Sequence, residues 1–302
     1  MTSHESVAPG PGTPLAEVEI DEALVRGLLA DQMPELAEQP ITLLDMGWDN
    51  VSFRLGATRI LRMPRREVAV PLLENEQRWL PLLAPRLPIA VPAPIAVGRP
   101  GRGYPWSWSL LPWIPGQSAD LDAPAADQAE LFAGFLKALH RPAPDDAPNN
   151  IYRGVPLVDR ADATVERMDR LRKTTNQITP EVEEAWRVAL ATPLATESTW
   201  VHGDLHARNV LVDEGSLTGI IDWGDMTSGD GSTDLAAIWM LFNDHRARRR
   251  VLDAYDPPKT MILRARGWAV FFGVVLLDSG LVDHPGHAAM GEATLRRLTE
   301  DG

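Results

Sequence analysis

The sequence contains no cysteine among its 302 residues, which excludes disulfide bonds and thiolate metal sites. It contains no run of eighteen apolar residues, and its first residues lack the basic flank and apolar core of a signal peptide. We therefore expect neither a signal peptide nor a membrane span. Because disulfides are rare in reducing compartments, the lack of cysteine also fits a cytoplasmic location.

Basic residues are outnumbered, with 29 Lys and Arg against 42 Asp and Glu and a net charge of −13. Residues 121–302 hold 19 basic and 28 acidic residues, so most of the excess lies there. Such an excess argues against nucleic acids and anionic membranes as partners and would attract a cationic small molecule. Acidity is also common in proteins that are simply soluble, so it does not decide the partner. Nothing in the sequence indicates an oligomeric state.

Polar side chains that could carry chemistry gather around a predicted hairpin near residue 215. A turn that contains Asp and Gly is flanked by two β-branched runs, 209–212 and 217–221. A hairpin brings its ends together, so Asp204 and Asn209 before it should face Asp222 after it. Two carboxylates and an amide on a rigid support suit Mg²⁺, which prefers few oxygen ligands and keeps some waters.

The spacing from Asp204 to Asn209 repeats that of the kinase catalytic loop, where an Asp meets the attacking hydroxyl and an Asn ligates metal. Two ordered motifs are present: His202-Gly203-Asp204-Leu205-His206-x-x-Asn209 and Ile221-Asp222-Trp223-Gly224-Asp225. Together they resemble the aminoglycoside phosphotransferase family of antibiotic kinases, which are small-molecule relatives of the protein kinases. The alternative is a surface turn that happens to collect Asp, His and Asn, and two ordered motifs around one hairpin weigh against it.

The resemblance implies transfer of the terminal phosphate of ATP or GTP to a hydroxyl of a small molecule. Asp204 would be the catalytic residue that orients the hydroxyl and accepts its proton. Asn209 and Asp222 would hold Mg²⁺ against the phosphates. We expect His202 to brace the loop from within, and we assign no chemical role to His206.

The N-terminal region predicts a helix followed by three antiparallel strands. Residues 19–36 place apolar side chains on one helical face and two acidic residues in the first turn. Gly-containing turns then separate predicted strands over 41–47, 50–56 and 59–63. In a kinase-like lobe the first of these turns lies over the nucleotide phosphates, which makes Asn50 and Ser52 candidate nucleotide-binding residues. The turn has a single glycine, unlike the Gly-rich loop of protein kinases, and taken alone it would be an ordinary hairpin turn.

The next segment predicts a helix with a carboxylate in its apolar stripe. One helical face carries Leu72, Glu76, Trp79, Leu80 and Leu83. A buried charge needs a partner, and the resemblance supplies the basic residue of the third strand, which also holds the nucleotide phosphates. That residue is Arg62 in place of the usual lysine, so the charge is kept but the geometry differs. The alternatives are a snorkelling edge position for Glu76 and a phosphate contact from Arg65 or Arg66.

Residues 85–117 are rich in proline and tryptophan. Their last part, 111–116, matches in position the hinge between kinase lobes, where backbone groups recognise the purine base. Leu111 and Trp113 are therefore candidate nucleotide-binding residues. Trp113 would stack on the base or the substrate, whereas packing within the protein is the commoner role of a tryptophan in such a segment.

Beyond residue 117 the pattern becomes helical. Apolar periodicity predicts helices over 126–139, 158–172, 181–190, 234–242, 244–255, 267–281 and 288–299. The segment 267–281 is almost wholly apolar, but fifteen residues are too few to cross a bilayer comfortably, so we expect a core helix. Asp234, at the start of an apolar helix, should organise the catalytic loop or cap that helix.

These elements predict an α+β, two-lobed, protein-kinase-like fold with a small antiparallel-sheet lobe and a mainly helical lobe. The boundaries that we assign are a flexible tail over 1–17, a nucleotide-binding lobe over 18–112, and a helical lobe with the catalytic loop and substrate site over 113–302.

Three functions fit this prediction. The first is a kinase of aminoglycoside or macrolide antibiotics that confers resistance, and the second is a metabolic kinase of an alcohol, amino alcohol or sugar. The third is a nucleotide-binding protein without turnover, which the complete set of Asp204, Asn209 and Asp222 weighs against. The motifs indicate the reaction class and not the acceptor. The acidity of residues 121–302 favours a cationic acceptor, but only weakly.

Overall fold

The computed structural model describes residues 14–195 and 197–301, which form two compact units. The first unit comprises the described residues up to Pro85 together with Pro92–Ile114, and the second comprises Arg86–Val91 and the described residues from Pro115 onward. Of the expected flexible tail, residues 1–13 lie outside the described residues. Near the end of that segment, the backbone N–H of Glu17 donates a hydrogen bond of 2.9 Å to the carbonyl oxygen of Arg65. The expected boundaries at 18–112 and 113–302 stay a prediction.

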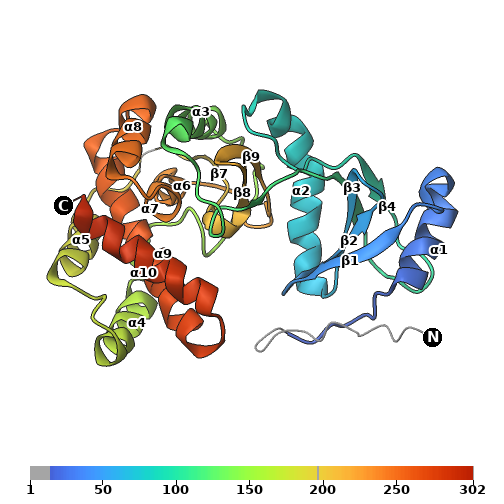
Figure 1. The fold of residues 1–302 in the computed structure, drawn as a ribbon, viewed down its shortest axis with the longest axis horizontal. Helices are drawn as coiled ribbons and strands as arrows, with labels where there is room; N and C mark the ends of the chain where they lie inside the picture. Colours follow the sequence, from blue (N-terminus) through green and yellow to red (C-terminus); the bar gives the residue numbers. More distant parts are fainter. Residues whose placement is uncertain (1–13, 196, 302) are drawn as a thin grey trace. The chain divides into compact units, whose positions relative to one another are not determined.

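The first unit is built on an antiparallel sheet with the strand order β1-β2-β3-β5-β4 (Figure 1). Along β2, buried apolar residues alternate with partly exposed polar ones, so one face of the strand points into a core. The strands are β1 Ile41–Met46, β2 Asn50–Leu55, β3 Arg59–Pro64, β4 Ala96–Gly98 and β5 Trp108–Pro112. The three consecutive strands predicted from the sequence are confirmed.

Helix α1, Glu22–Gln32, covers one face of this sheet (Figure 1). The carboxylate of Asp21 caps it by accepting a 2.7 Å hydrogen bond from the N–H of Leu24. The core beneath it includes Val25, Leu28, Leu29, Val51, Phe53 and Leu55. The predicted amphipathic helix is confirmed but is shorter than 19–36, because Pro34 opens a separate turn of 3₁₀ helix.

Helix α2, Val70–Leu83, lies on the other face of the sheet (Figure 1). Its Gln77 side chain donates to the hydroxyl of Ser109 on β5 at 3.0 Å. The buried residues of the helix are Leu73, Glu76, Trp79, Leu80 and Leu83. The expected stripe contained Leu72 in place of Leu73, and that detail is wrong. Leu72 and Leu73 both lie about one turn before Glu76, so helical spacing allows either to be buried, and packing against the sheet decides that Leu73 is the buried one.

The second unit is mainly helical and contains two small antiparallel sheets, with strand orders β10-β7 and β6-β8-β9. Its helices are α3 Ala129–Leu139, α4 Ala161–Thr174, α5 Pro180–Ala191, α6 Ser232–Leu235, α7 Ala237–Leu241, α8 His245–Tyr255, α9 Lys259–Asp283 and α10 Pro285–Glu300. Its strands are β6 Gln117–Ser118, β7 Thr199–Val201, β8 Val210–Asp213, β9 Ser216–Ile220 and β10 Thr227–Gly229. The single helix expected over 234–242 is wrong, because the chain is interrupted at Ala236 and forms α6 and α7 instead.

Strands β8 and β9 form the predicted hairpin. Its turn residues Glu214 and Gly215 have φ values of +48° and +79°. Two successive left-handed residues are what a tight turn of type I′ requires, and this turn matches the natural twist of the strands. Strand β6 pairs with the other edge of β8, so the hairpin is part of a three-stranded sheet that supports the residues on either side of it.

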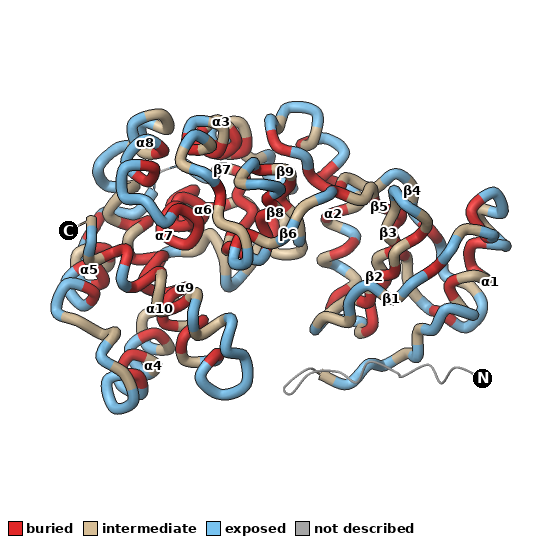
Figure 2. The backbone as a smooth tube through the Cα atoms, in the orientation of Figure 1, coloured by how far each residue is buried: buried red, intermediate tan, exposed pale blue. Residues whose placement is uncertain are grey.

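Helix α9 is the core helix of the second unit and is buried over most of its length (Figure 2). It packs against α4, α5, α6 and α10. Among the described residues it is the one helix that is long and apolar enough to cross a membrane, yet 67% of its apolar window is buried inside the protein. The core helix predicted over 267–281 is therefore confirmed, within a longer helix.

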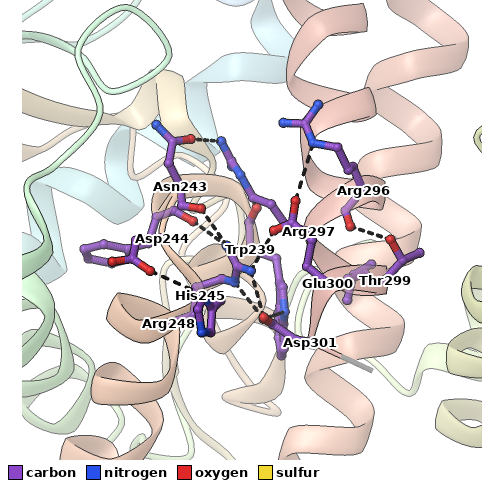
Figure 3. A network of polar contacts seen from close by, with 12 residues as sticks. Trp239, Asn243, Asp244, His245, Arg248, Arg296, Arg297, Thr299, Glu300 and Asp301 are labelled. Carbon is purple, nitrogen blue, oxygen red and sulfur yellow. Dashed lines mark hydrogen bonds and ion pairs between the residues drawn. The ribbon is translucent and has the colours of Figure 1, made fainter.

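A network of buried arginines fastens α10 to the segment between α7 and α8 (Figure 3). The guanidinium of Arg248 is 1% exposed and contacts the carboxylates of Asp301 at 2.6 Å and Glu300 at 3.0 Å. It also donates to the carbonyl oxygen of Phe242 at 3.0 Å. Arg297 on α10 donates in turn to the carbonyl oxygens of Trp239 and Met240, so the carbonyl groups at the end of α7 are satisfied.

Replacing Arg248 by Met should lower the free energy of unfolding by about 3 kcal/mol or more, because it leaves carboxylate and carbonyl groups without their buried partner. Chemical denaturation measures the change. Arg250→Met on the same helix is the matched control, since Arg250 pairs with Glu130 at the exposed surface. Equal losses in the two variants would contradict the role given to burial.

Candidate active site

The loop after β7 is held from behind by a buried carboxylate. Asp234 on α6 is fully buried and accepts hydrogen bonds from the backbone N–H groups of His202 at 2.6 Å and Gly203 at 2.9 Å. The imidazole of His140 lies 3.3 Å from the same carboxylate and 2.7 Å from the hydroxyl of Tyr255. Of the two roles predicted for Asp234, organising this loop or capping the helix, the structure shows the first.

Gly203 and His202 allow the loop after β7 to pack closely against the Asp234 carboxylate. Gly203 has φ +88°, and a Cβ there would lie 2.5 Å from the carbonyl oxygen of Asp225, so only glycine fits. The His202 ring is buried beside Trp223, with Nε2 2.9 Å from the carbonyl oxygen of Ile221. Since Nε2 donates there, Nδ1 is free to accept from the N–H of Asp204 at 3.3 Å. His202 thus braces the loop from within, as predicted.

Basic groups surround the carboxylate of Asp204. Its Oδ1 accepts from Nη2 of Arg153 at 2.9 Å, and its Oδ2 lies 3.3 Å from Nε2 of His206. Burial opposes ionisation of this carboxyl group, but His206 and Arg153 hold its pKa well below the ordinary value. Asp204 is therefore an anion at neutral pH and can accept a hydrogen bond from a hydroxyl group.

The structure brings Asn209 and Asp222 to the same end of the hairpin. The N–H of Ile221 donates to the carbonyl oxygen of Asn209 at 2.9 Å, which places Asp222 directly after the contact. The amide nitrogen of Asn209 donates to the backbone oxygen of Asp204 at 2.8 Å, so its amide oxygen faces the opposite way. Asp222 has φ +61°, a left-handed conformation that Asp tolerates better than most residues. One amide oxygen and one carboxylate on fixed backbone fit Mg²⁺, which completes its shell with water and phosphate oxygens.

Sequence reasoning missed Arg153 and the residue that holds its loop, Asn150. The Asn150 side-chain oxygen accepts from the N–H groups of Tyr152 and Arg153, and its amide nitrogen donates to Oδ1 of Asp225 at 2.7 Å. Burial raises the pKa of Asp225, while Arg153, 3.7 Å from its Oδ2, works against that rise. No periodicity or motif links Arg153 to Asp204, which follows 51 residues later.

The residues expected to bind the nucleotide phosphates lie together on the sheet of the first unit. Nη1 of Arg62 lies 3.3 Å from Oε1 of Glu76, whose side chain is 3% exposed. Ser52 is the direct partner of Arg62 across β2 and β3. With its amide oxygen turned inward, Asn50 accepts from Nη2 and Nε of Arg62 at 3.2 and 3.3 Å. The expected pair of Arg62 and Glu76 is present, and its role towards phosphate stays a prediction.

The alternative phosphate ligands, Arg65 and Arg66, contact the turn before β2. Arg65 is buried and donates to the carbonyl oxygen of Gly47 at 2.9 Å. Arg66 forms an ion pair with Asp49. Both guanidinium groups therefore fix the turn that the resemblance places over the phosphates.

At the expected hinge, Leu111 is paired with Ile60 on β3, and the N–H of Trp113 donates to the carbonyl oxygen of Thr58 at 2.8 Å. The guanidinium carbon of Arg54 lies 3.4 Å from the centre of the Trp113 ring. One face of Trp113 is thus covered by a side chain of its own unit. Arg54 was not expected, because nothing in the local pattern links the two positions.

Comparisons with known proteins identify relatives of this chain. A family model described as "Phosphotransferase enzyme family" matches residues 40–268. An aminoglycoside 3'-phosphotransferase from Salmonella typhimurium is 28% identical over 144 residues, which cover 44% of this chain and 52% of that protein. The chain therefore spans about half the length of this curated relative.

Solved structures share the fold. The GDP and kanamycin complex of APH(2")-IIIa has a TM-score of 0.64 and 18% identity, covering 92% of this chain and 99% of the other. The macrolide 2'-phosphotransferase MphH from Brachybacterium faecium has a TM-score of 0.55 and 21% identity, covering 90% of this chain and 97% of the other. The likeness confirms the predicted two-lobed, kinase-like α+β fold.

The pair of Arg62 and Glu76 makes a testable unit. If Arg62 contacts the nucleotide phosphates as predicted, Arg62→Ala and Glu76→Ala should each raise the Michaelis constant for nucleotide and lower turnover, because Glu76 orients the guanidinium. The double variant should cost clearly less than the sum of the two single losses. Steady-state kinetics at varied nucleotide concentration measure all three variants and Arg62→Lys. If phosphate binding needs the two-point contact of a guanidinium, Arg62→Lys should not restore the Michaelis constant or the turnover.

The exposed pair of Arg26 and Glu22 on α1 provides the matched control, and its removal should leave the kinetics unchanged. Strictly additive losses for Arg62 and Glu76 would show that the two residues act independently. In that event Arg65 or Arg66 becomes the better phosphate ligand.

Proposed function

The chain belongs to the phosphotransferase enzyme family, and on this premise we propose that it transfers the terminal phosphate of ATP or GTP to a hydroxyl of a small molecule. The observation that carries the proposal is that Asp204, Asn209 and Asp222 lie on one braced loop and hairpin. The Asn209 amide hydrogen-bonds to the backbone oxygen of Asp204. Asp222 directly follows Ile221, whose N–H donates to the carbonyl oxygen of Asn209. Nucleotide-bound relatives of the same fold support a nucleotide donor. The complete set weighs against a nucleotide-binding protein without turnover.

Asp204 would receive the acceptor hydroxyl. Its carboxylate is ionised at neutral pH, because neighbouring basic groups lower its pKa. Such an anion is a weak base, but phosphoryl transfer asks the protein mainly for positioning and charge stabilisation. A hydroxyl hydrogen-bonded to Asp204 is aligned for attack and passes its proton to that carboxylate, while the new P–O bond forms and the bond from the same phosphorus to the departing nucleoside diphosphate breaks.

Asn209 and Asp222 would hold Mg²⁺, which neutralises phosphate charge when it is bound. In the first unit, Arg62, oriented by Glu76 and Asn50, would contact the nucleotide phosphates, with Ser52 beside it. Leu111 and Trp113 would provide the backbone at which the purine base binds. A cytoplasmic location belongs to the same proposal, since the lack of cysteine fits that compartment.

Two classes of acceptor are proposed. The relatives and structural neighbours suggest an aminoglycoside or macrolide antibiotic, in which case the protein would confer resistance. The second class is a metabolic alcohol, amino alcohol or sugar. One observation favours the second class: the guanidinium of Arg153, and not a further carboxylate, contacts Asp204. By pairing with Asp204, Arg153 neutralises part of its negative charge and weakens its attraction for a polycationic acceptor.

Two variants separate chemistry from metal binding. Asp204→Asn should lower turnover by about two orders of magnitude or more, while the affinity for Mg²⁺-nucleotide is nearly kept, because Asp204 acts on the acceptor. Asp222→Ala should abolish the Mg²⁺ dependence of nucleotide binding. Nucleotide consumption across a panel of aminoglycosides, macrolides, alcohols and sugars, with calorimetric titration of Mg²⁺-nucleotide, measures both effects.

Asp213→Ala is the control, because this aspartate is exposed at the outer end of β8. Near-normal turnover of Asp204→Asn would remove the catalytic assignment. An unchanged titration of Asp222→Ala would place the metal elsewhere.

A further inference from the structure

The side chain of Arg153 joins the two sequence motifs of the active site. Its Nη2 donates to Oδ1 of Asp204 at 2.9 Å, and its Nε lies 3.7 Å from Oδ2 of Asp225. Its guanidinium carbon lies 5.4 Å from the ring centre of Phe272 on α9, within the range of a cation–π contact. Of the two carboxylates, the catalytic one is therefore the closer partner of this cation.

The segment that carries Arg153, residues 148–154, is fixed by backbone contacts at both ends. The carbonyl oxygen of its first residue accepts from the N–H of Ser228, and that of its last residue accepts from the N–H of Asp230, both at 3.0 Å. The last residue, Gly154, has φ +66°, and a Cβ there would lie 3.1 Å from backbone of β10. Strand β10 pairs with β7, which leads into the catalytic loop. The segment and the loop thus rest on one small sheet, and neither end of the segment is held by the guanidinium.

Two further contacts direct the side chain of Arg153 towards the catalytic loop. The side-chain oxygen of Asn150 accepts from the N–H of Arg153 at 3.2 Å, and the Asn150 amide nitrogen donates to Oδ1 of Asp225 at 2.7 Å. A Cβ on Gly203 would lie 3.1 Å from Cβ and 3.3 Å from Cγ of Arg153. The aliphatic stem of Arg153 therefore lies directly against the residue that precedes Asp204, and the guanidinium is left beside the carboxylate.

A cation on a catalytic carboxylate can have two roles, and they predict opposite effects of its removal. If Arg153 only withdraws charge from Asp204, its loss makes the carboxylate a stronger base, and turnover should rise. If Arg153 fixes the orientation of the carboxylate, its loss lets Asp204 rotate, and turnover should fall. Burial raises the pKa of Asp225 and the charge of Asp204 raises it further, while Arg153 opposes the rise, so the two carboxylates repel each other. Because phosphoryl transfer depends mainly on positioning, we expect the effect on orientation to be the larger one.

We infer that Arg153 is a positioning residue, which acts through Asp204 by holding its carboxylate in the orientation that receives the acceptor hydroxyl. The inference rests on the proposed phosphotransfer and adds a residue that lies in neither motif. Asp234 fixes the backbone immediately before Asp204, and Arg153 fixes the side chain. The segment 148–154 is thus part of the catalytic machinery, although it precedes the catalytic loop by about fifty residues in the chain.

Arg153→Met removes the charge and the hydrogen bond but keeps most of the aliphatic stem. With the most active acceptor of the panel, turnover should fall about ten-fold to a hundred-fold, the scale of a misplaced reacting group, while the Michaelis constant for nucleotide stays unchanged. Arg153→Lys should recover part of the turnover, because it restores one charged donor but not the planar group. Arg170→Met on α4 is the matched control, because Arg170 pairs with Asp278 at the surface, and it should change neither constant. Thermal unfolding checks that each variant is folded, and Arg153→Lys keeps the test valid if the Met variant is not.

A double-mutant cycle shows whether Arg153 acts through Asp204. In the background of Asp204→Ala, which lacks the carboxylate, adding Arg153→Met should lower the residual turnover by less than about three-fold, because the group that it positions is gone. Nitrogen NMR of the guanidinium reports the contact without turnover. The Nη signals, assigned by their loss in Arg153→Lys, should be resolved separately in the unmodified protein and averaged in Asp204→Ala.

Higher or unchanged turnover in Arg153→Met overturns the inference. An equal loss with and without the Asp204 carboxylate also overturns it, as do averaged Nη signals in the unmodified protein. The proposed phosphotransfer survives these results if Asp204→Asn still loses turnover and nucleotide binding still depends on Asp222. Full turnover of Asp204→Asn removes the catalytic assignment and, with it, the role given to Arg153.

Discussion

The active loop depends on the buried carboxylate of Asp234. This group is fully enclosed, and burying it is favourable only because the N–H groups of His202 and Gly203 donate to it at 2.6 and 2.9 Å. The same two bonds fix the backbone immediately before Asp204. The hairpin fixes Asn209 and Asp222 on the other side. The positions of the two carboxylates and the amide are therefore set by backbone contacts and not by flexible side chains.

Local charge and total charge point in different directions in this protein. The chain carries a net charge of −13, which would favour a cationic partner at long range. Around Asp204, however, the contacting side chains are the basic groups of Arg153 and His206. The partner of a site is set by the groups that it contacts, so the local arrangement carries more weight for the acceptor.

Much of this arrangement could be predicted from the sequence, because it follows from local rules. Gly and Asp between β-branched runs specify the hairpin, and helical spacing places Glu76 in a buried stripe, for which the resemblance supplies Arg62 as the partner. The rest depends on contacts between loops that are far apart in the chain. Arg153 reaches Asp204 across 51 residues, and Arg54 covers Trp113 from another strand. Neither contact leaves a period or a motif, and the interruption at Ala236 is likewise invisible in an apolar run.

The most direct test of this account replaces Asp234 by Asn, which keeps the shape but turns a hydrogen-bond donor towards one of the two N–H groups. Amide hydrogen exchange at His202 and Gly203, measured together with turnover, reports whether the loop and the chemistry fail together. We predict faster exchange at both residues and a loss of turnover of about two orders of magnitude, while Asp244→Asn, at an exposed helix cap, changes neither. Full turnover with a loosened loop would contradict the claim that Asp234 positions the catalytic carboxylate.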